Sequence, residues 1–325
     1  MNDNLNVAKT AKNDEFYTQY ADIEREAKAY VAYDKDVFRD KTILLPCDDP
    51  ERSNFTRYFL DHFEDYGIGK LISTCNAPQM RFKSPLFTGT GHGRYLVRMR
   101  GEDASAGFFD GDGDFRSAEI TELRDAADII VTNPPFSLFR EFIEWIRGKH
   151  FLVLGNMNAI TYKEIFPLIM RNEVWTGITP ITGSRWFEVG DPKFTNKYMK
   201  IVDEKRLIPI KSVWYTNLEH GRRHEPLTLH TMEDNVANSK HGIIRKNGYQ
   251  HYDNYDAIDV PFTDAIPSDY DGVMGVPISF LDRYCPEQFE IVGNEYSLNI
   301  DKGRGYIDGK RIYSRIFIRH RHPKT

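Results

Sequence analysis

The sequence predicts an α/β protein with a doubly wound, mainly parallel sheet. Three observations support this: apolar strand patterns recur along the first half of the chain, amphipathic helix patterns separate them, and polar turns follow the strands. Alternating strands and helices place helices on both faces of a parallel sheet. Ligands of such a sheet bind outside the carboxyl ends of its strands, at the point where the strand order reverses.

The first strand–helix–strand unit is predicted at residues 41–46, 53–66 and 70–74. Its helix pattern places an aromatic side chain at every fourth position: Phe55, Phe59 and Phe63. These rings share one face of the helix. Gly67 follows where a helix C-terminus is expected. An earlier amphipathic helix is predicted over residues 21–30, for which Thr18 is an acceptable N-cap residue.

The second unit is predicted at residues 128–131, 137–147 and 151–154. Its first strand ends in the turn Asn133-Pro134-Pro135-Phe136. Consecutive prolines fix φ near about −65° and remove backbone donors, so the chain leaves the sheet in a rigid turn with free carbonyl oxygens. The simple alternative is a strand that stops at proline.

This turn has the chemistry to hold a planar amine. The Asn133 side-chain oxygen and the Pro134 carbonyl could together accept both hydrogens of an exocyclic amine, while Phe136 offers a face for stacking. The acidic turn at residues 47–50 follows the other predicted parallel strand. We therefore expect the two turns to face one another across a single cleft.

Composition excludes several classes of protein. The chain has 325 residues, 40% of them hydrophobic, which suffices for a substantial core. No apolar run approaches membrane-spanning length and the N-terminus is not a signal peptide, so a cytoplasmic protein without a membrane partner is expected. Three widely spaced cysteines predict neither a disulfide framework nor a zinc site, and no metal site is expected. Three histidines are expected on the surface or in loops: His220, His224 and His230.

Charge is distributed unevenly along the chain. The net charge is −5, yet residues 301–325 contain eight Lys and Arg against two Asp. A strand pattern over residues 311–319 could lay cations along nucleic-acid phosphates. A solvated basic tail is the alternative.

The chain is expected to divide near residue 216. Residues 1–215 would form a catalytic domain and residues 216–325 a C-terminal region for DNA recognition. Residues 75–108 resemble an excursion that contains Gly89, Gly91 and Gly93. The alternating Asp and Gly over residues 110–115 could bind Ca²⁺, but the later bidentate Glu of an EF-hand is missing.

The turn at residues 133–136 resembles motif IV of methyltransferases that act on amino groups, chiefly the adenine-N6 DNA enzymes. With its companions it is similar to the EcoRI-type adenine-specific DNA methyltransferase family over nearly the whole chain. The segments that carry this resemblance are residues 14–20, 47–50, 53–55, 111–117, 132–139, 160–164, 252–257 and 272–277. It weakens over residues 76–100 and 177–250.

The resemblance implies a Rossmann-like core that binds S-adenosylmethionine. The implied cofactor-binding residues are Phe16, Tyr17, Thr18, Asp48, Asp49, Asp114 and Phe115. Asp114 would accept from the cofactor adenine amine and Phe115 would pack on its ring, while either Asp48 or Asp49 would bind the methionine amino group. The chain departs from the general pattern in two places: it lacks a Gly-rich turn at residues 46–50 and an acid directly after residues 71–75.

The implied catalytic residues are those of the turn, Asn133, Pro134, Pro135 and Phe136. They would methylate N6 of an adenine flipped out of double-stranded DNA. The enzyme would belong to a restriction-modification system or act alone, as a monomer in a bacterium or encoded by a phage, with GAATTC suggested as its site. Alternatives are a methyltransferase with the same turn that acts on RNA or protein glutamine, and a DNA-binding module without catalysis.

Overall fold

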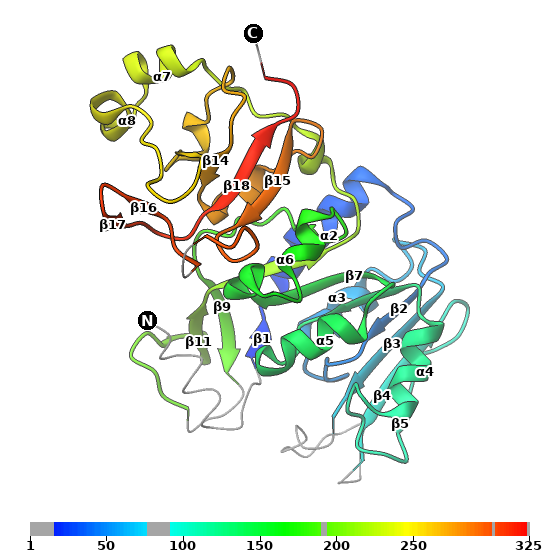
Figure 1. The fold of residues 1–325 in the computed structure, drawn as a ribbon. Coiled ribbons are helices and arrows are strands. Elements are labelled where there is room, and N and C mark those ends of the chain that lie inside the picture. The colour runs from blue at the N-terminus through cyan, green and yellow to red at the C-terminus, as the bar shows by residue number, and fades with distance from the viewer. Residues whose placement is uncertain (1–15, 77–91, 190–193, 301–302, 324–325) are drawn as a thin grey trace. The chain divides into compact units, whose positions relative to one another are not determined.

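The computed structural model describes residues 16–76, 92–189, 194–300 and 303–323. It divides into two compact units, shown in Figure 1. Unit 1 comprises residues 1–165 and 174–220, and unit 2 comprises residues 166–173 and 221–325. Each unit is described by itself below.

Unit 1 is built on an eight-stranded sheet with the order β5-β4-β3-β2-β6-β7-β12-β8. Its strands are β2 (Thr42–Leu45), β3 (Lys70–Cys75), β4 (Arg94–Met99), β5 (Ser105–Phe108), β6 (Ile129–Thr132), β7 (His150–Asn156), β8 (Trp175–Thr176) and β12 (Ser212–Thr216). The central strands β3, β2, β6 and β7 run parallel, as predicted. The strands outside them pair antiparallel, so the sheet is mixed rather than mainly parallel. Antiparallel strands need no helical crossover, so the chain adds them to both edges through other connections.

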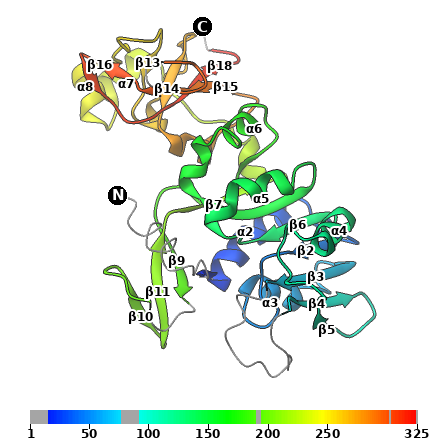
Figure 2. The same cartoon turned by 60° about the horizontal axis from the view of Figure 1, so that its bottom comes forward.

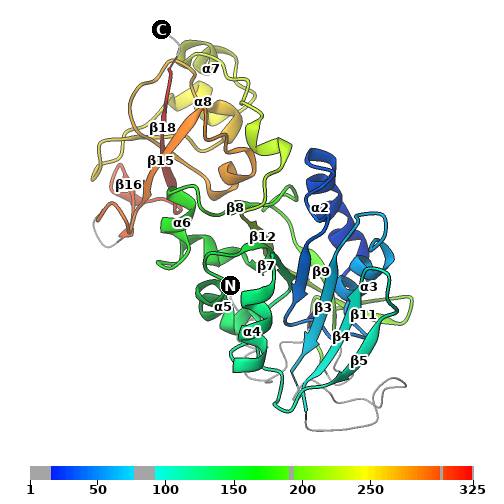
Figure 3. The same ribbon diagram turned by 90° about the vertical axis from the view of Figure 1, so that its right-hand side faces the viewer.

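Helices cover both faces of this sheet (Figures 1 and 3). They are α2 (Tyr20–Tyr33), α3 (Asn54–Asp61), α4 (Ala118–Ala126) and α5 (Phe139–Trp145). Alternate residues of β2 point to opposite faces. Ile43 and Leu45 pack with residues of α2 and α3, whereas Leu44 packs in a smaller cluster with Leu123 of α4 and Trp145 of α5. Burial on both faces explains why β2 reads as a continuous apolar run.

The predicted helix over residues 53–66 is shorter in the structure. Ser53 is the N-cap of α3 and its hydroxyl accepts from the Phe55 amide at 3.0 Å. The helix ends at Asp61, and turns lead on to Gly67, whose φ of 61° is the left-handed conformation expected there. The helix after the proline turn likewise begins later, because a 3₁₀ turn, η2 (Phe136–Leu138), precedes α5.

A second, four-stranded sheet of unit 1 contains a segment predicted to precede a helix. β1 (Phe16–Thr18) pairs antiparallel with β9 (Arg185–Val189). β9 pairs in turn with β11 (Lys205–Ile210), and β11 pairs with β10 (Lys200–Val202) (Figure 2). Thr18 is therefore a strand residue and not the N-cap of α2, a position held by Gln19 without a side-chain hydrogen bond. Hydrophobic periodicity weakens after about residue 170, so the sequence did not predict this sheet.

Unit 2 contains a four-stranded sheet with the order β13-β14-β18-β15. Its elements are α6 (Phe166–Met170), α7 (Met232–Asn238), α8 (Gly242–Asn247), β13 (Ile258–Asp259), β14 (Met274–Val276), β15 (Phe289–Asn294), β16 (Tyr306–Ile307), β17 (Lys310–Arg311) and β18 (Ile316–His320). The remaining short helices of the two units are η3 (Met157–Thr161), η4 (Gly221–His224), η5 (Thr263–Ala265) and η6 (Ile278–Arg283).

The prediction of one continuous strand over residues 311–319 is wrong. The pattern is split between β17 and β18, and the residues between them are not in a strand. Arg315 lies in that gap and pairs with Asp259 at 2.8 Å, with only 11% of its side chain exposed. Cations therefore do not line one continuous strand.

All three histidines lie on the surface or in loops, as predicted. His224 and His230 are partly exposed and pair with Glu287 and Asp234. His220 lies outside the regular elements but is buried, and its ring packs edge-on against Tyr30 at 5.6 Å. In the part of the chain that the structure describes, no helix could cross a membrane. The same described residues contain no cluster of His, Cys, Asp and Glu suited to a metal ion.

Candidate functional site

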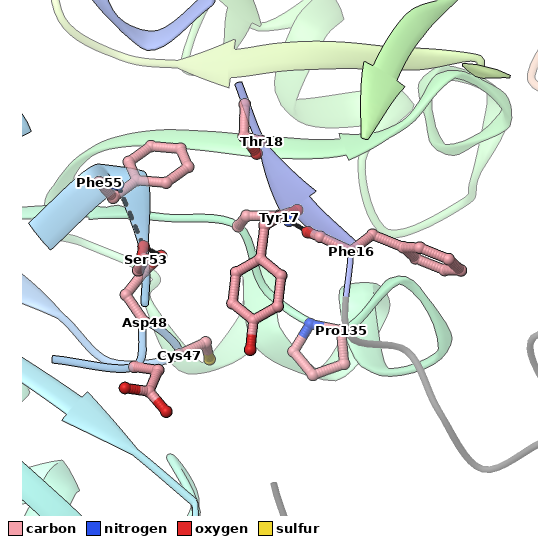
Figure 4. Close-up of a pocket in the computed structure, with 10 residues that line it drawn as sticks. Phe16, Tyr17, Thr18, Cys47, Asp48, Ser53, Phe55 and Pro135 are labelled. Atoms are coloured by element: carbon pink, nitrogen blue, oxygen red, sulfur yellow. Dashed lines mark hydrogen bonds between the residues drawn. The ribbon is translucent and has the colours of Figure 1, made fainter. Parts of the chain in front are cut away.

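A pocket lies at the carboxyl ends of β2 and β6, where the winding of the sheet reverses. From β2 the chain passes to β3 on one side and returns to β6 on the other, which makes this the switch point of the sheet. The pocket is lined by Phe16, Tyr17, Thr18, Cys47, Asp48, Asp49, Ser53, Phe55, Asn133 and Pro135 (Figure 4). The two turns that follow the parallel strands thus face one cleft, as their positions in the sequence predict.

Asp48 ties three elements together beneath the pocket. Its carboxylate accepts from the Ser53 hydroxyl at 2.6 Å, at the start of α3, and from the Thr132 hydroxyl at 2.6 Å, at the end of β6. Burial raises the pKa of Asp48 to about 7, against the opposing effect of these hydroxyl donors. Asp48 therefore links the turn after β2 to the start of α3 and to the end of β6.

Asp49 has a different set of partners. Its carboxylate receives a hydrogen bond from buried Arg94 at 3.0 Å and another from the Glu51 backbone amide at 2.9 Å. Arg94 begins β4, so this ion pair joins the turn after β2 to a strand on the far side of β3. A carboxylate has about four lone-pair sites, so Asp48 and Asp49 both keep acceptor capacity for a ligand.

The β1 strand forms the opposite wall of the pocket and is held by asparagine side chains. Asn133 Nδ2 donates to the Phe16 carbonyl at 2.7 Å, and Asn54 Nδ2 donates to the Thr18 carbonyl at 2.8 Å. The other edge of β1 pairs with β9. Figure 4 shows the Tyr17 ring between Cys47 and Pro135, with its hydroxyl directed away from the strand.

Two buried polar atoms of the pocket have no partner in the described part of the chain. The Thr18 hydroxyl oxygen and Asn133 Oδ1 make no hydrogen bond within the described residues, although both are shielded from solvent. Leaving such atoms unpaired costs about 1–3 kcal/mol each. Because Asn133 Nδ2 is fixed on the Phe16 carbonyl, its Oδ1 is an oriented acceptor for a donor that the described residues do not supply.

The remaining turn residues lie outside the pocket lining. Pro134 is buried, and Phe136 is partly buried against the main core of unit 1. The Phe136 ring meets Phe187 of β9 edge-on with 6.2 Å between centroids. The packing of Phe136 on β9 could not be predicted, because β9 comes from a segment without clear periodicity.

Asp114 and Phe115 also lie outside the pocket lining. Arg116 donates to both carboxylate oxygens of Asp114, at 2.8 and 2.7 Å, and lowers the pKa of that carboxyl. Asn76, directly after β3, adds a hydrogen bond to Asp114 at 3.3 Å. Phe115 is 3% exposed and packs against Phe142 of α5. The structure thus brings seven predicted residues to the pocket but not Asp114, Phe115, Pro134 or Phe136.

Sequence reasoning left three lining residues out of the predicted site: Cys47, Ser53 and Phe55. Each belongs to a segment that resembles the EcoRI-type family, and Ser53 could have been found as an N-cap residue that precedes an apolar helix face. Other parts of the predicted motifs lie outside the described residues, namely Asp14, Glu15, Gly89 and Gly91.

Comparison with known proteins gives matches along almost the whole chain. A family model described as adenine-specific methyltransferase EcoRI matches residues 4–321. The chain is 40% identical over 328 residues to Type II methyltransferase M.EcoRI of Escherichia coli, covering 98% of this chain and 96% of that protein. It is 34% identical over 339 residues to Type II methyltransferase M.MpnI of Mycoplasma pneumoniae, covering 98% of each. No solved structure gives a significant match.

Proposed function

Because this chain belongs to the EcoRI family of adenine-specific methyltransferases, and is thus a site-specific DNA adenine methyltransferase, we propose that its switch-point pocket binds S-adenosylmethionine. Family membership implies a methyl donor and a DNA substrate. The eight-stranded sheet of unit 1 would be the Rossmann-like core for this cofactor. Residues 216–325 would form the DNA-recognition region. We further propose that the enzyme acts as a monomer, on DNA in the cytoplasm.

The pocket residues fit this cofactor. Asp48 and Asp49 offer carboxylates to its amino group, and the unpartnered Thr18 hydroxyl offers a further polar contact. Phe16, Tyr17 and Phe55 supply apolar surface. When bound, S-adenosylmethionine supplies a methyl group carried on a positively charged sulfur.

Asn133 would position the nucleophile. Its Oδ1 and the Pro134 carbonyl would accept both hydrogens of the adenine N6 amine, which leaves the nitrogen lone pair directed at the methyl group. The fixed oxygens of Asn133 and Pro134 would also stabilise the positive charge that the amine nitrogen would acquire on methylation. The amine proton would then leave to solvent. Phe136 would stack on the flipped base, whose unstacking costs a few kcal/mol.

The observation that carries this assignment is the buried, unpartnered Oδ1 of Asn133. Replacement of Asn133 by Ala should lower kcat by about 10² or more, the loss usual for one such charge-stabilising contact. Cofactor affinity should change far less, because the lost acceptor serves the substrate. The measurements are transfer of labelled methyl to duplex DNA and calorimetric titration with S-adenosylmethionine. Asn238→Ala, on the exposed surface of α7, is the matched control.

Two results would contradict the proposal. If Asn133→Ala methylated DNA at the wild-type rate, Asn133 would not hold the amine. If label appeared on RNA or protein but not on duplex DNA, the alternatives named from the sequence would replace adenine in DNA as the substrate.

A further inference from the structure

Unit 2 carries a short, well-defined β-hairpin formed by β16 and β17. Tyr306 pairs with Arg311 and Ile307 with Lys310, so that Asp308 and Gly309 alone make the turn. Both turn residues have positive φ, 49° and 69°. This is the pattern of a type I′ turn, whose twist matches that of the flanking strands.

The side chains of Asp253 and Asn254, which are not part of the pocket in unit 1, hold the hairpin by hydrogen bonds. The Asp253 carboxylate accepts from the turn amides of Asp308 at 3.1 Å and Gly309 at 2.8 Å. Asn254 accepts from the Tyr306 amide at 3.2 Å and donates to the Arg304 carbonyl at 2.9 Å. Asp253 and Asn254 belong to the segment 252–257, one of those that resemble the EcoRI-type family. Their side chains therefore fix the hairpin before any ligand binds.

A groove lies beside this hairpin. Its polar and aromatic lining residues are Asn247, Gln250, Asp259, Asp308, Lys310, Arg311, Tyr313 and Arg315. Tyr313 is 87% exposed, and Lys310 and Arg311 are exposed as well. Neither of these two cations makes an ion pair within the described ranges, whereas Arg315 is engaged by Asp259.

We propose that this groove binds duplex DNA, with Lys310 and Arg311 neutralising backbone phosphates. Lys310 and Arg311 form no ion pair among the described residues, so binding to a phosphate would break no existing pair. A β-ribbon is also an element that fits into a DNA groove. Asn247 and Tyr313 add hydrogen-bonding and stacking groups beside them. The inference rests on duplex DNA being the substrate and adds the element that contacts it.

The test is the salt dependence of DNA binding. The double variant Lys310→Ala/Arg311→Ala and the wild type are titrated with a fluorescent DNA duplex at several salt concentrations. Each phosphate contact contributes about 0.9 to the slope of log K against log salt, so the variant should give a slope shallower by about 1.8. Its affinity for S-adenosylmethionine should equal that of the wild type.

The matched control is Arg25→Ala/Lys28→Ala, which removes the same charge from the exposed face of α2. It should keep the wild-type slope. An unchanged slope in the hairpin variant would overturn the proposal, as would equal changes in both double variants. A slope change with duplex RNA but not with DNA would overturn it too. None of these three results would affect the assignment of Asn133, which depends on methyl transfer.

Asp253 gives a second, independent test as a positioning residue. Asp253→Ala leaves the turn amides without their acceptor and should weaken DNA binding several-fold, whereas Asp253→Asn retains one acceptor oxygen and should restore part of the loss. Thermal unfolding shows whether both variants remain folded. Equal DNA affinity in wild type, Asp253→Ala and Asp253→Asn would show that the held hairpin does not contact DNA.

Discussion

The Asp48 carboxyl is buried beneath the pocket and joins its two turns. Its side chain is held by Ser53 and Thr132, yet burial outweighs these donors and raises its pKa to about 7. The folded state thus favours the protonated carboxyl more than the unfolded state does, whose pKa is near the ordinary value of 3.8. A cationic group bound beside Asp48 would favour the carboxylate instead.

Asp48 should therefore make the free energy of unfolding depend on pH. Because the folded-state pKa is raised, its stabilising contribution is fully present below the unfolded pKa and is lost as pH rises through about 7. Between pH 5 and pH 8 this amounts to about 3 kcal/mol. Urea unfolding without cofactor should show wild type losing more stability over this range than Asp48→Asn. Exposed Asp103 provides the control, Asp103→Asn, which should follow wild type. Parallel profiles for wild type and Asp48→Asn would contradict the assignment.

Thr18 and Asn133 show how far single residues could be interpreted from sequence. Asn133 was predicted as an amine acceptor from its turn alone, and the structure gives it a buried oxygen without a protein partner among the described residues. Its tether to the Phe16 carbonyl links positions far apart in the chain, and no local pattern reveals such a bond. Thr18 suited a helix cap equally well until the pairing of β1 with β9 placed it in a strand.

At the scale of elements, α2 is joined to the segment after β8 by one buried side chain. Glu26 is fully buried and accepts from the amides of Ile178 at 2.8 Å and Thr179 at 3.0 Å, and from the Thr179 hydroxyl. Gly177 allows this approach, since a Cβ there would lie 1.9 Å from a Glu26 oxygen. Burial raises the pKa of Glu26.

Replacement of Glu26 by Ala should lower the free energy of unfolding by about 3 kcal/mol or more, because several buried donors lose their acceptor at about 1–3 kcal/mol each. Glu26→Gln should cost less, since one acceptor oxygen remains. Glu24→Ala on the same helix removes only an exposed pair with Lys28 and should cost far less than Glu26→Ala. Urea denaturation of the three variants gives the comparison. If Glu26→Ala were no more harmful than Glu24→Ala, Glu26 would not secure this segment.

At the scale of the whole molecule, each unit has a hydrophobic core of its own. In unit 1 the largest cluster joins α2 and α3 to the sheet, and in unit 2 a cluster forms around Tyr252, Ala257, Ile300 and Phe317. The proposed division of labour, cofactor binding in one unit and DNA recognition in the other, therefore has a physical basis in separate packing.

This division predicts separable defects. Phe317 is fully buried in unit 2 between Tyr252 and Tyr255, and Phe317→Ala should destabilise that unit by about 3–5 kcal/mol. DNA affinity should fall strongly in this variant, while calorimetric affinity for S-adenosylmethionine should remain near wild type. Parallel loss of both affinities would contradict the proposed division near residue 216.

The sequence by itself determined the parallel strands β2, β3, β6 and β7, most of their helices and the meeting of two turns at one edge of the sheet. These features follow from local periodicity and from the rule that parallel strands share a carboxyl end. Tertiary structure alone decided that β1 closes the pocket, that Asn133 is bonded to the Phe16 carbonyl and that the basic C-terminal pattern is split around a paired Arg315. Those outcomes depend on pairings between residues distant in the chain, whose partners are set by packing and not by neighbours in sequence.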